Sequence, residues 1–166
     1  MSATHGVEQV AAVILAGGLG TRLRAVVRAQ PKVLAPVRGK PFLAYLLDQL
    51  CGAGIRTAVI CSGYLGEQIE AAFGSAYGPV RVEYSREAAP LGTGGALRAA
   101  APLLGDHPVL VLNGDSYCEL DPRALWAWHA AKGAAASIAC RGPASVVHRE
   151  RGRAPGRLGQ RRSILR

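Results

Sequence analysis

A glycine-rich turn directly after the first apolar run has the residue types that bind phosphate. The run ends in VILAGGLGTRLR, which places Gly17, Gly18 and Gly20 immediately before Thr21 and Arg22. Glycine lets backbone N–H groups approach a ligand closely, because it has no Cβ and tolerates positive φ. Amides at such a turn, beside the start of a helix, suit phosphate oxygens. We interpret the turn as a candidate phosphate site; a plain strand-to-helix turn is the alternative.

The turn matches neither of two common nucleotide-binding fingerprints. The dinucleotide pattern GxGxxG would need a glycine where Leu23 stands. A Walker loop would need serine or threonine after Gly39-Lys40, where the chain has Pro41. Both fingerprints are therefore excluded.

Lys32 could supply a cation close to the glycine turn. It lies between Pro31 and Val33 in a segment bracketed by prolines, and Pro31 stiffens the backbone there. A lone lysine is usually a solvated surface charge, but this position could place its ammonium on phosphate oxygens. Arg22 and Lys32 together would offset the charge of a triphosphate and of a departing pyrophosphate.

A second glycine cluster, LGTGG, contains Gly92, Thr93, Gly94 and Gly95. Bare glycines admit a flat base or a ribose against the backbone, and Thr93 offers a hydroxyl. The alternative is a flexible strand-to-helix loop. Two such clusters at the carboxyl ends of strands lie where open α/β sheets bind their ligands.

Asp115 follows the most hydrophobic run of the chain, in the tripeptide Asn113-Gly114-Asp115. A carboxylate there is costly unless it caps a helix or binds a cation. Beside a phosphate site we favour Mg²⁺, which takes one or two carboxylates together with substrate phosphates.

No Ser/His/acid or Cys/His arrangement is evident in the sequence. That fits an ionised phosphate attacking another phosphate, with catalysis by alignment and charge stabilisation.

Strands alternate with helices along the chain, which indicates a doubly wound α/β fold with a mainly parallel, Rossmann-like sheet. We expect strands at 10–16, 57–61, 80–84, 108–112 and 135–139. We expect helices from Pro41 to the glycines at 52 and 54, at 66–73, at 96–104 and at 122–131. Residues 30–40 are expected to be largely extended, because three prolines bracket them.

The length and composition suit one domain. A chain of 166 residues, 49% of them hydrophobic, can bury a sizeable core. No apolar run reaches the roughly 18 residues of a membrane span, and residues 1–9 lack a signal pattern. We therefore expect a cytoplasmic protein without a membrane partner. The four cysteines have no metal-ligand spacing, and we interpret them as buried free thiols.

The net charge of +9 lies mostly in residues 141–166, which contain eight arginines against one glutamate. This segment shows no helix or strand pattern, and we expect a disordered tail after a nucleotide-binding domain over residues 1–140. Nucleic-acid binding through the arginines is an alternative. The segment has no Phe, Tyr or Trp between its arginines that could stack on bases. We therefore expect no nucleic-acid partner.

Five motifs, in content and order, resemble the sugar-1-phosphate nucleotidylyltransferases. They are LAGGLGTRLR, PKVLAPVRGKPFLAYLL, GYLGEQIEAAFG, PLGTGGAL and VLNGDS, and the resemblance covers residues 10–139. It implies the nucleotide-diphospho-sugar transferase type of fold. It also implies transfer of a nucleoside monophosphate from an NTP to a sugar 1-phosphate, with release of pyrophosphate. Within the family the chain looks most similar to the heptose-1-phosphate guanylyltransferases, which make GDP-D-glycero-α-D-manno-heptose for surface polysaccharides. Mannose-1-phosphate guanylyltransferases are the alternative.

The resemblance implies roles for individual residues. Leu15, Ala16, Gly17 and Gly18 would contact the nucleoside, and Gly20, Thr21 and Arg22 the triphosphate. Lys32 would bind near the α-phosphate, so that Arg22 and Lys32 are the catalytic residues. Gly92, Thr93, Gly94 and Gly95 would face the base, and Asp115 would hold Mg²⁺. The chain could also form a homo-oligomer, which the sequence does not decide.

The resemblance ends at residue 139. The family continues with strands that carry sugar-binding residues and a second metal-binding aspartate, which cannot be placed in this chain. We hypothesise a frameshift or truncation, which would leave the fold incomplete at the C-terminus, nucleotide binding weak and turnover lost. A non-catalytic nucleotide-binding module on the same fold is the competing hypothesis.

Overall fold

A computed structural model describes residues 6–18, 30–140 and 145–149 of the chain. The chain divides into two compact units, Met1–Pro122 and Arg123–Arg166, and each is described here by itself. The first unit carries the candidate site. It begins with a short 3-10 turn, η1 (Val7–Gln9).

A five-stranded sheet with the order β5-β6-β4-β1-β7 forms the centre of the first unit. Its strands are β1 (Ala11–Leu15), β4 (Thr57–Ser62), β5 (Ala76–Tyr77), β6 (Val80–Arg86) and β7 (Val109–Asn113). β6, β4, β1 and β7 are parallel, and the short β5 is antiparallel to β6. The predicted α/β fold with a mainly parallel sheet is therefore confirmed. The prediction missed β5, because two residues between turns carry no alternation.

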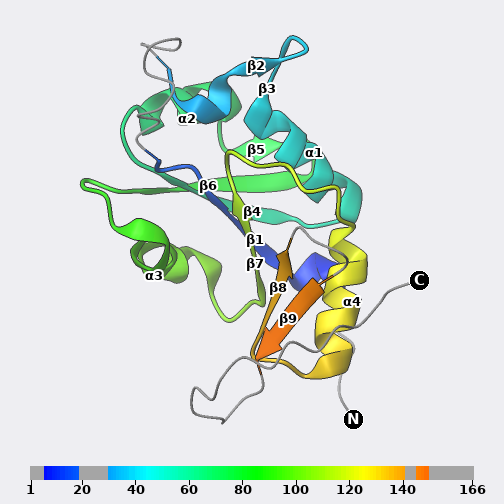
Figure 1. Ribbon diagram of the computed structural model, residues 1–166. Helices are drawn as coiled ribbons and strands as arrows, with labels where there is room; N and C mark the ends of the chain where they lie inside the picture. The colour runs from blue at the N-terminus through cyan, green and yellow to red at the C-terminus, as the bar shows by residue number, and fades with distance from the viewer. Residues whose placement is uncertain (1–5, 19–29, 141–144, 150–166) are drawn as a thin grey trace. The chain divides into compact units, whose positions relative to one another are not determined.

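Helices cover both faces of this sheet, with α3 (Gly92–Leu104) on one side and α1 (Phe42–Ala53) and α2 (Gly66–Phe73) on the other (Figure 1). Alternate residues of the two central strands form one core with α3, and they are Ala11, Val13, Val59, Cys61, Ala96, Ala100 and Leu104. The alanines of α3 let the helix approach the sheet closely. Side chains on successive strand residues point to opposite faces, so a strand buried between two layers is apolar throughout.

The bounds of α1 follow from its flanking residues. Pro41 precedes the helix with φ −54°, and Gly54 ends it in the left-handed region with φ +86°. The Gly54 N–H donates to the carbonyl oxygens of Leu50 and Cys51, which caps the last turn. The predicted helix after Pro41 is confirmed.

The segment predicted to be extended contains instead a 3-10 turn and a small hairpin. The turn is η2 (Lys32–Leu34), and the hairpin pairs β2 (Pro36–Val37) with β3 (Lys40–Pro41). Its two loop residues, Arg38 and Gly39, both have positive φ, as type I′ hairpin turns require. The expectation of a largely extended segment is wrong at η2 and at the turn residues Arg38 and Gly39, because a proline fixes only its own φ and leaves the residues after it free to turn. β2 and β3 themselves are extended.

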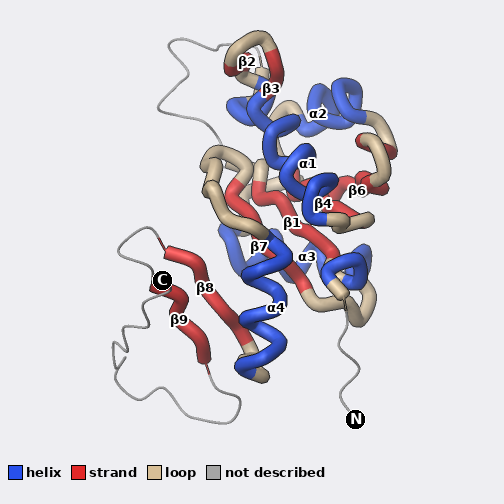
Figure 2. Tube along the Cα trace, turned by 90° about the vertical axis from the view of Figure 1, so that its right-hand side faces the viewer, coloured by secondary structure: helices blue, strands red, loops and turns tan. Residues whose placement is uncertain are grey.

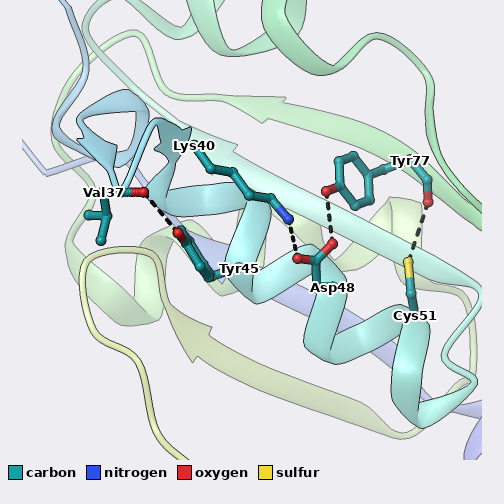
Figure 3. A network of polar contacts seen from close by, with 6 residues as sticks. All are labelled: Val37, Lys40, Tyr45, Asp48, Cys51 and Tyr77. Carbon is teal, nitrogen blue, oxygen red and sulfur yellow. Dashed lines mark hydrogen bonds and ion pairs between the residues drawn. The ribbon is translucent and has the colours of Figure 1, made fainter.

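Polar contacts tie this hairpin to α1 and β5 (Figure 3). The Lys40 ammonium pairs with the Asp48 carboxylate, and the Tyr77 hydroxyl donates to the same carboxylate at 2.9 Å. The Tyr45 hydroxyl donates to the Val37 carbonyl oxygen at 2.8 Å. A hairpin this short is not stable alone, so these side chains give it a fixed place on the helix.

The second unit contains α4 (Pro122–Lys132) from Arg123 onward, followed by an antiparallel hairpin of β8 (Ala136–Cys140) and β9 (Ser145–Arg149). The tube view in Figure 2 shows the two strands of this hairpin in red. The expectation that no strand follows residue 141 is wrong for β9, which is a strand because β8 pairs with it. The other residues of the predicted tail, 141–144 and 150–166, lie outside the described residues. Within the described parts of the chain, no helix is long and apolar enough to cross a membrane.

Candidate nucleotide-phosphate site

Gly114 brings the end of β7 into contact with the end of β1. Its N–H donates to the Leu15 carbonyl oxygen at 2.9 Å. A Cβ at this position would lie 2.8 Å from that oxygen and 3.3 Å from the Ala16 Cα. Those atoms are backbone and cannot rotate away, so only glycine fits here. Gly114 was not among the site residues predicted from the sequence. Its position between Asn113 and Asp115 is the feature of the sequence that could have indicated it.

The 3-10 turn η2 directs Lys32 outward. Val33, the next residue, is only 3% exposed and anchors the turn in the core. The turn is closed by the Leu34 N–H, which donates to the Pro31 carbonyl oxygen, and by the Ala35 N–H, which donates to that of Lys32. The Val33 side chain also reaches the Gly114 backbone, since a Cβ there would lie 3.2 Å from its Cγ1.

Lys32 and Asp115 form an ion pair, with 2.9 Å between Nζ and Oδ2. The two residues are 83 positions apart in the chain, and they are the cation and the carboxylate that the sequence assigned to one site. Their side chains are 39% and 51% exposed. The Ser116 hydroxyl donates to the other carboxylate oxygen at 3.2 Å. The Lys32 ammonium holds the pKa of Asp115 below its usual value.

This pair can exchange partners with a charged ligand. Because both side chains are open to solvent, phosphate oxygens can compete for the ammonium and a cation for the carboxylate. Among the described residues no three His, Cys, Asp or Glu side chains gather as metal ligands. A lone accessible carboxylate fits a Mg²⁺ ion that takes its remaining ligands from phosphates and water.

The first glycine turn begins at the same edge of the sheet. Leu15 pairs with Cys61 of β4 and with Asn113 of β7, and the Ala16 N–H donates to the Cys61 carbonyl oxygen at 2.8 Å. A Cβ on Gly18 would meet no described atom within 4 Å, so its backbone is open to a ligand. Gly20, Thr21 and Arg22 lie outside the described residues.

The second glycine cluster forms the first turn of α3, which begins at Gly92 and not at residue 96 as predicted. The first turn of a helix leaves its N–H groups without intrahelical partners, so it tolerates glycines there that a helix interior would not. Among described atoms, nothing lies within 4 Å of a Cβ on Gly92 or Gly94. Gly95 is closed, because its Cβ would lie 2.6 Å from the Leu91 Cβ.

The thiol of Cys61, on β4 beside the site, is not an activated nucleophile. Burial raises the pKa of Cys61 to about 11, with a smaller effect from the charge of Glu87. Such a thiol is protonated near neutral pH and is inert. The interpretation of the cysteines as buried thiols holds for Cys61 but is wrong for Cys118, which is exposed. Cys118 lies in the irregular segment between β7 and α4.

Known proteins share this arrangement of sequence and fold. A family model for nucleotidyl transferases matches residues 11–150. This chain belongs to the nucleotidyl transferase family. The predicted likeness to sugar-1-phosphate enzymes of that family is confirmed by its similarity to curated relatives.

Two of those relatives are guanylyltransferases. D-glycero-alpha-D-manno-heptose 1-phosphate guanylyltransferase of Aneurinibacillus thermoaerophilus is 42% identical over 118 residues, which are 71% of this chain and 51% of the relative. Mannose-1-phosphate guanylyltransferase of Mycobacterium tuberculosis is 41% identical over 129 residues, 76% of this chain and 35% of the relative. The chain spans about half the length, or less, of the curated relatives it matches.

A solved structure agrees in fold. HddC from Yersinia pseudotuberculosis, in complex with GMP-PN, is 38% identical and aligns with a TM-score of 0.63. The alignment covers 71% of this chain and 53% of HddC.

Proposed function

We propose that this chain forms the nucleotide half of a sugar-1-phosphate guanylyltransferase. The reaction is the transfer of GMP from GTP to D-glycero-α-D-manno-heptose 1-phosphate, which gives a GDP-sugar for surface polysaccharide synthesis and pyrophosphate. The observation that carries the proposal is the Lys32–Asp115 pair at the carboxyl edge of the sheet, next to the first glycine turn. Guanine and heptose are supported by the similarity to the Aneurinibacillus relative, and mannose is the alternative sugar.

In this proposal the ammonium of Lys32 leaves Asp115 and binds the α-phosphate region, where negative charge rises as the pyrophosphate departs. Arg22 binds the β- and γ-phosphates. Asp115 provides one carboxylate to Mg²⁺, which would neutralise phosphate charge and align the triphosphate. The attacking group, the phosphate of the sugar, is already ionised and needs no general base. Catalysis is then positioning together with charge stabilisation.

The backbone at the two glycine clusters binds the nucleoside in this proposal. The backbone of Leu15–Gly18 contacts the nucleoside on one side. The open faces of Gly92 and Gly94 accept the flat base on the other side, with Thr93 offering its hydroxyl. Glycine is suited to such a surface because no Cβ separates the backbone from the ring.

A non-catalytic nucleotide-binding module is the second candidate. It rests on the site residues described above, which account for nucleotide contacts alone. The two candidates share the triphosphate site and differ in turnover. We place either one in the cytoplasm, where nucleoside triphosphates are available, with residues 1–140 as the nucleotide-binding portion.

A pyrophosphate-release matrix tests the proposal. GTP, UTP, CTP, ATP and dTTP are each paired with heptose, mannose and glucose 1-phosphates in the presence of Mg²⁺. Release above background only with GTP and the heptose supports the guanylyltransferase. GTP binding without release identifies the non-catalytic module. Neither binding nor release with any nucleotide would refute both candidates.

A further inference from the structure

Gln49 joins α1 to the irregular segment that follows β7, and it has no role in the function proposed above. Its Nε2 donates two hydrogen bonds of 2.8 Å, one to the Cys118 carbonyl oxygen and one to that of Leu120. The two acceptors lie 69 and 71 positions further along the chain. Figure 1 shows the segment running from the end of β7 past α1. A primary amide has two N–H groups, so it can bind both carbonyl groups at once.

The α1 end of this contact is firmly anchored. The helix has 12 residues, and its buried residues include Leu46 and Leu50, one turn before Gln49 and directly after it. The Gln49 side chain is itself half-buried. Because the helix is fixed in the core, its amide is presented from one place. The two hydrogen bonds therefore fix the backbone at Cys118 and Leu120 relative to the sheet.

The segment itself has little burial to order it. Residues 115–119 are exposed. At its start, the Gly114 N–H binds the Leu15 carbonyl oxygen. Among the described residues, the side chains from outside the segment that form hydrogen bonds or ion pairs with residues 115–120 are those of Lys32 and Gln49. Lys32 binds the Asp115 carboxylate, and Gln49 binds the backbone beyond it.

We propose that Gln49 is a positioning residue for Asp115. In the proposed function the ammonium of Lys32 leaves this carboxylate for the phosphates, so the segment loses one of its two side-chain partners. The Gln49 bonds remain, and Asp115 stays between them and the Gly114 bond. Without Gln49 the segment would have to be ordered when the cation and the nucleotide bind, which weakens affinity. The inference rests on the proposed function and concerns its cation-binding carboxylate.

Amide hydrogen exchange of the free protein tests the contact without any ligand. The Leu120 N–H donates to the Cys118 carbonyl oxygen at 2.8 Å, which is one of the two oxygens that Gln49 binds. We expect this amide to be protected in wild type and to exchange about fivefold faster in Gln49→Met, which keeps the side-chain length and removes both donors. Gln49→Glu, which puts an acceptor in place of the amide nitrogen, should have the same effect. A Leu120 amide that is unprotected in wild type, or equally protected in all three proteins, contradicts the inference.

Calorimetric titration with GTP, with and without Mg²⁺, tests the effect on the ligand. In Gln49→Met the tightening of GTP binding by Mg²⁺ should be about threefold to tenfold smaller than in wild type, because the segment must then be ordered on binding. GTP without Mg²⁺ should bind within about twofold of wild type. Tyr84→Phe is the matched control, since it also removes a side-chain hydrogen bond to a backbone carbonyl oxygen, that of Gly74 at 2.6 Å. It should leave both affinities within about twofold of wild type.

Three binding results would overturn the inference. The first is a Mg²⁺ effect in Gln49→Met as large as in wild type. The second is an equal loss of affinity with and without Mg²⁺, and the third is the same loss in Tyr84→Phe; both indicate general destabilisation. A wild-type chain that binds no GTP contradicts the proposed function, whereas the exchange measurement still decides whether Gln49 orders the segment.

Discussion

Replacing Lys32 by methionine should weaken nucleotide binding far more than it weakens the fold. The substitution keeps most of the aliphatic stem and removes the ammonium that lies 2.9 Å from Asp115. Because both side chains are substantially exposed, the ion pair stabilises the free protein by only about 0.2–1 kcal/mol. For a chain of this length, that corresponds to a fall in Tm of at most about 4 °C.

The effect on ligand binding has a different origin. A hydrogen bond from an ammonium to phosphate contributes about 1.5–3 kcal/mol, so Lys32→Met should weaken Mg²⁺-GTP binding by roughly 10- to 150-fold. Calorimetric titration measures the affinity, and a thermal melt measures the stability. Lys40→Met is the control, because Lys40 also pairs with an aspartate and has nearly the same exposure, 36%. Its partner Asp48 lies on α1 and not at the sheet edge.

Three results would refute this reasoning. GTP affinity within twofold of wild type in Lys32→Met would show that the ammonium does not bind the phosphates. A fall in Tm of 10 °C or more would show that the pair is chiefly structural. The same loss of affinity in Lys40→Met would attribute the effect to net charge.

Three further predictions follow from the site. Gly114→Ala should destabilise the protein by about 1–3 kcal/mol, seen as a lower midpoint in urea, since its Cβ would lie 2.8 Å from the Leu15 oxygen; an unchanged midpoint contradicts the close approach. Lys32 lowers the pKa of Asp115 from 3.8, so stability from this pair is present above that pH and is lost as the pH falls through the lowered pKa. Lys32→Met should accordingly raise the Asp115 pKa in carbon-detected NMR, and an unmoved titration counts against the pair. Cys61, with a pKa of about 11, should resist alkylation at pH 8 in the native state while exposed Cys118 reacts, and equal rates at the two thiols would contradict the burial.

The sequence predicted the elements whose signals are local. The apolar run of β1 and the proline and glycine at the ends of α1 were sufficient to place both. β9 (Ser145–Arg149) was missed, because its strand state depends on pairing with β8 and not on its own arginine-rich surroundings. The hairpin at residues 36–41 was missed for a similar reason, since contacts with Asp48 and Tyr45 on α1 hold it.

Two of the residues selected from the sequence, Lys32 and Asp115, lie together in the structure. Lys32 and Asp115 were selected because a cation after a glycine turn and a carboxylate after a strongly apolar strand have few structural uses. That their side chains pair directly could not be read from the sequence, because it depends on how η2 and the end of β7 meet. Gly114 and Gln49 were missed, since their roles arise from contacts with the backbone of Leu15, Cys118 and Leu120.

The proposal that Asp115 and Mg²⁺ act together on a nucleoside triphosphate is tested most directly by GTP titrations with and without Mg²⁺. Wild type and Asp115→Asn are compared by calorimetry in the same buffer. We expect Mg²⁺ to tighten GTP binding to wild type by tenfold or more and to have little effect on the variant. An equal Mg²⁺ effect on both proteins, or no GTP binding to wild type in either condition, would contradict it.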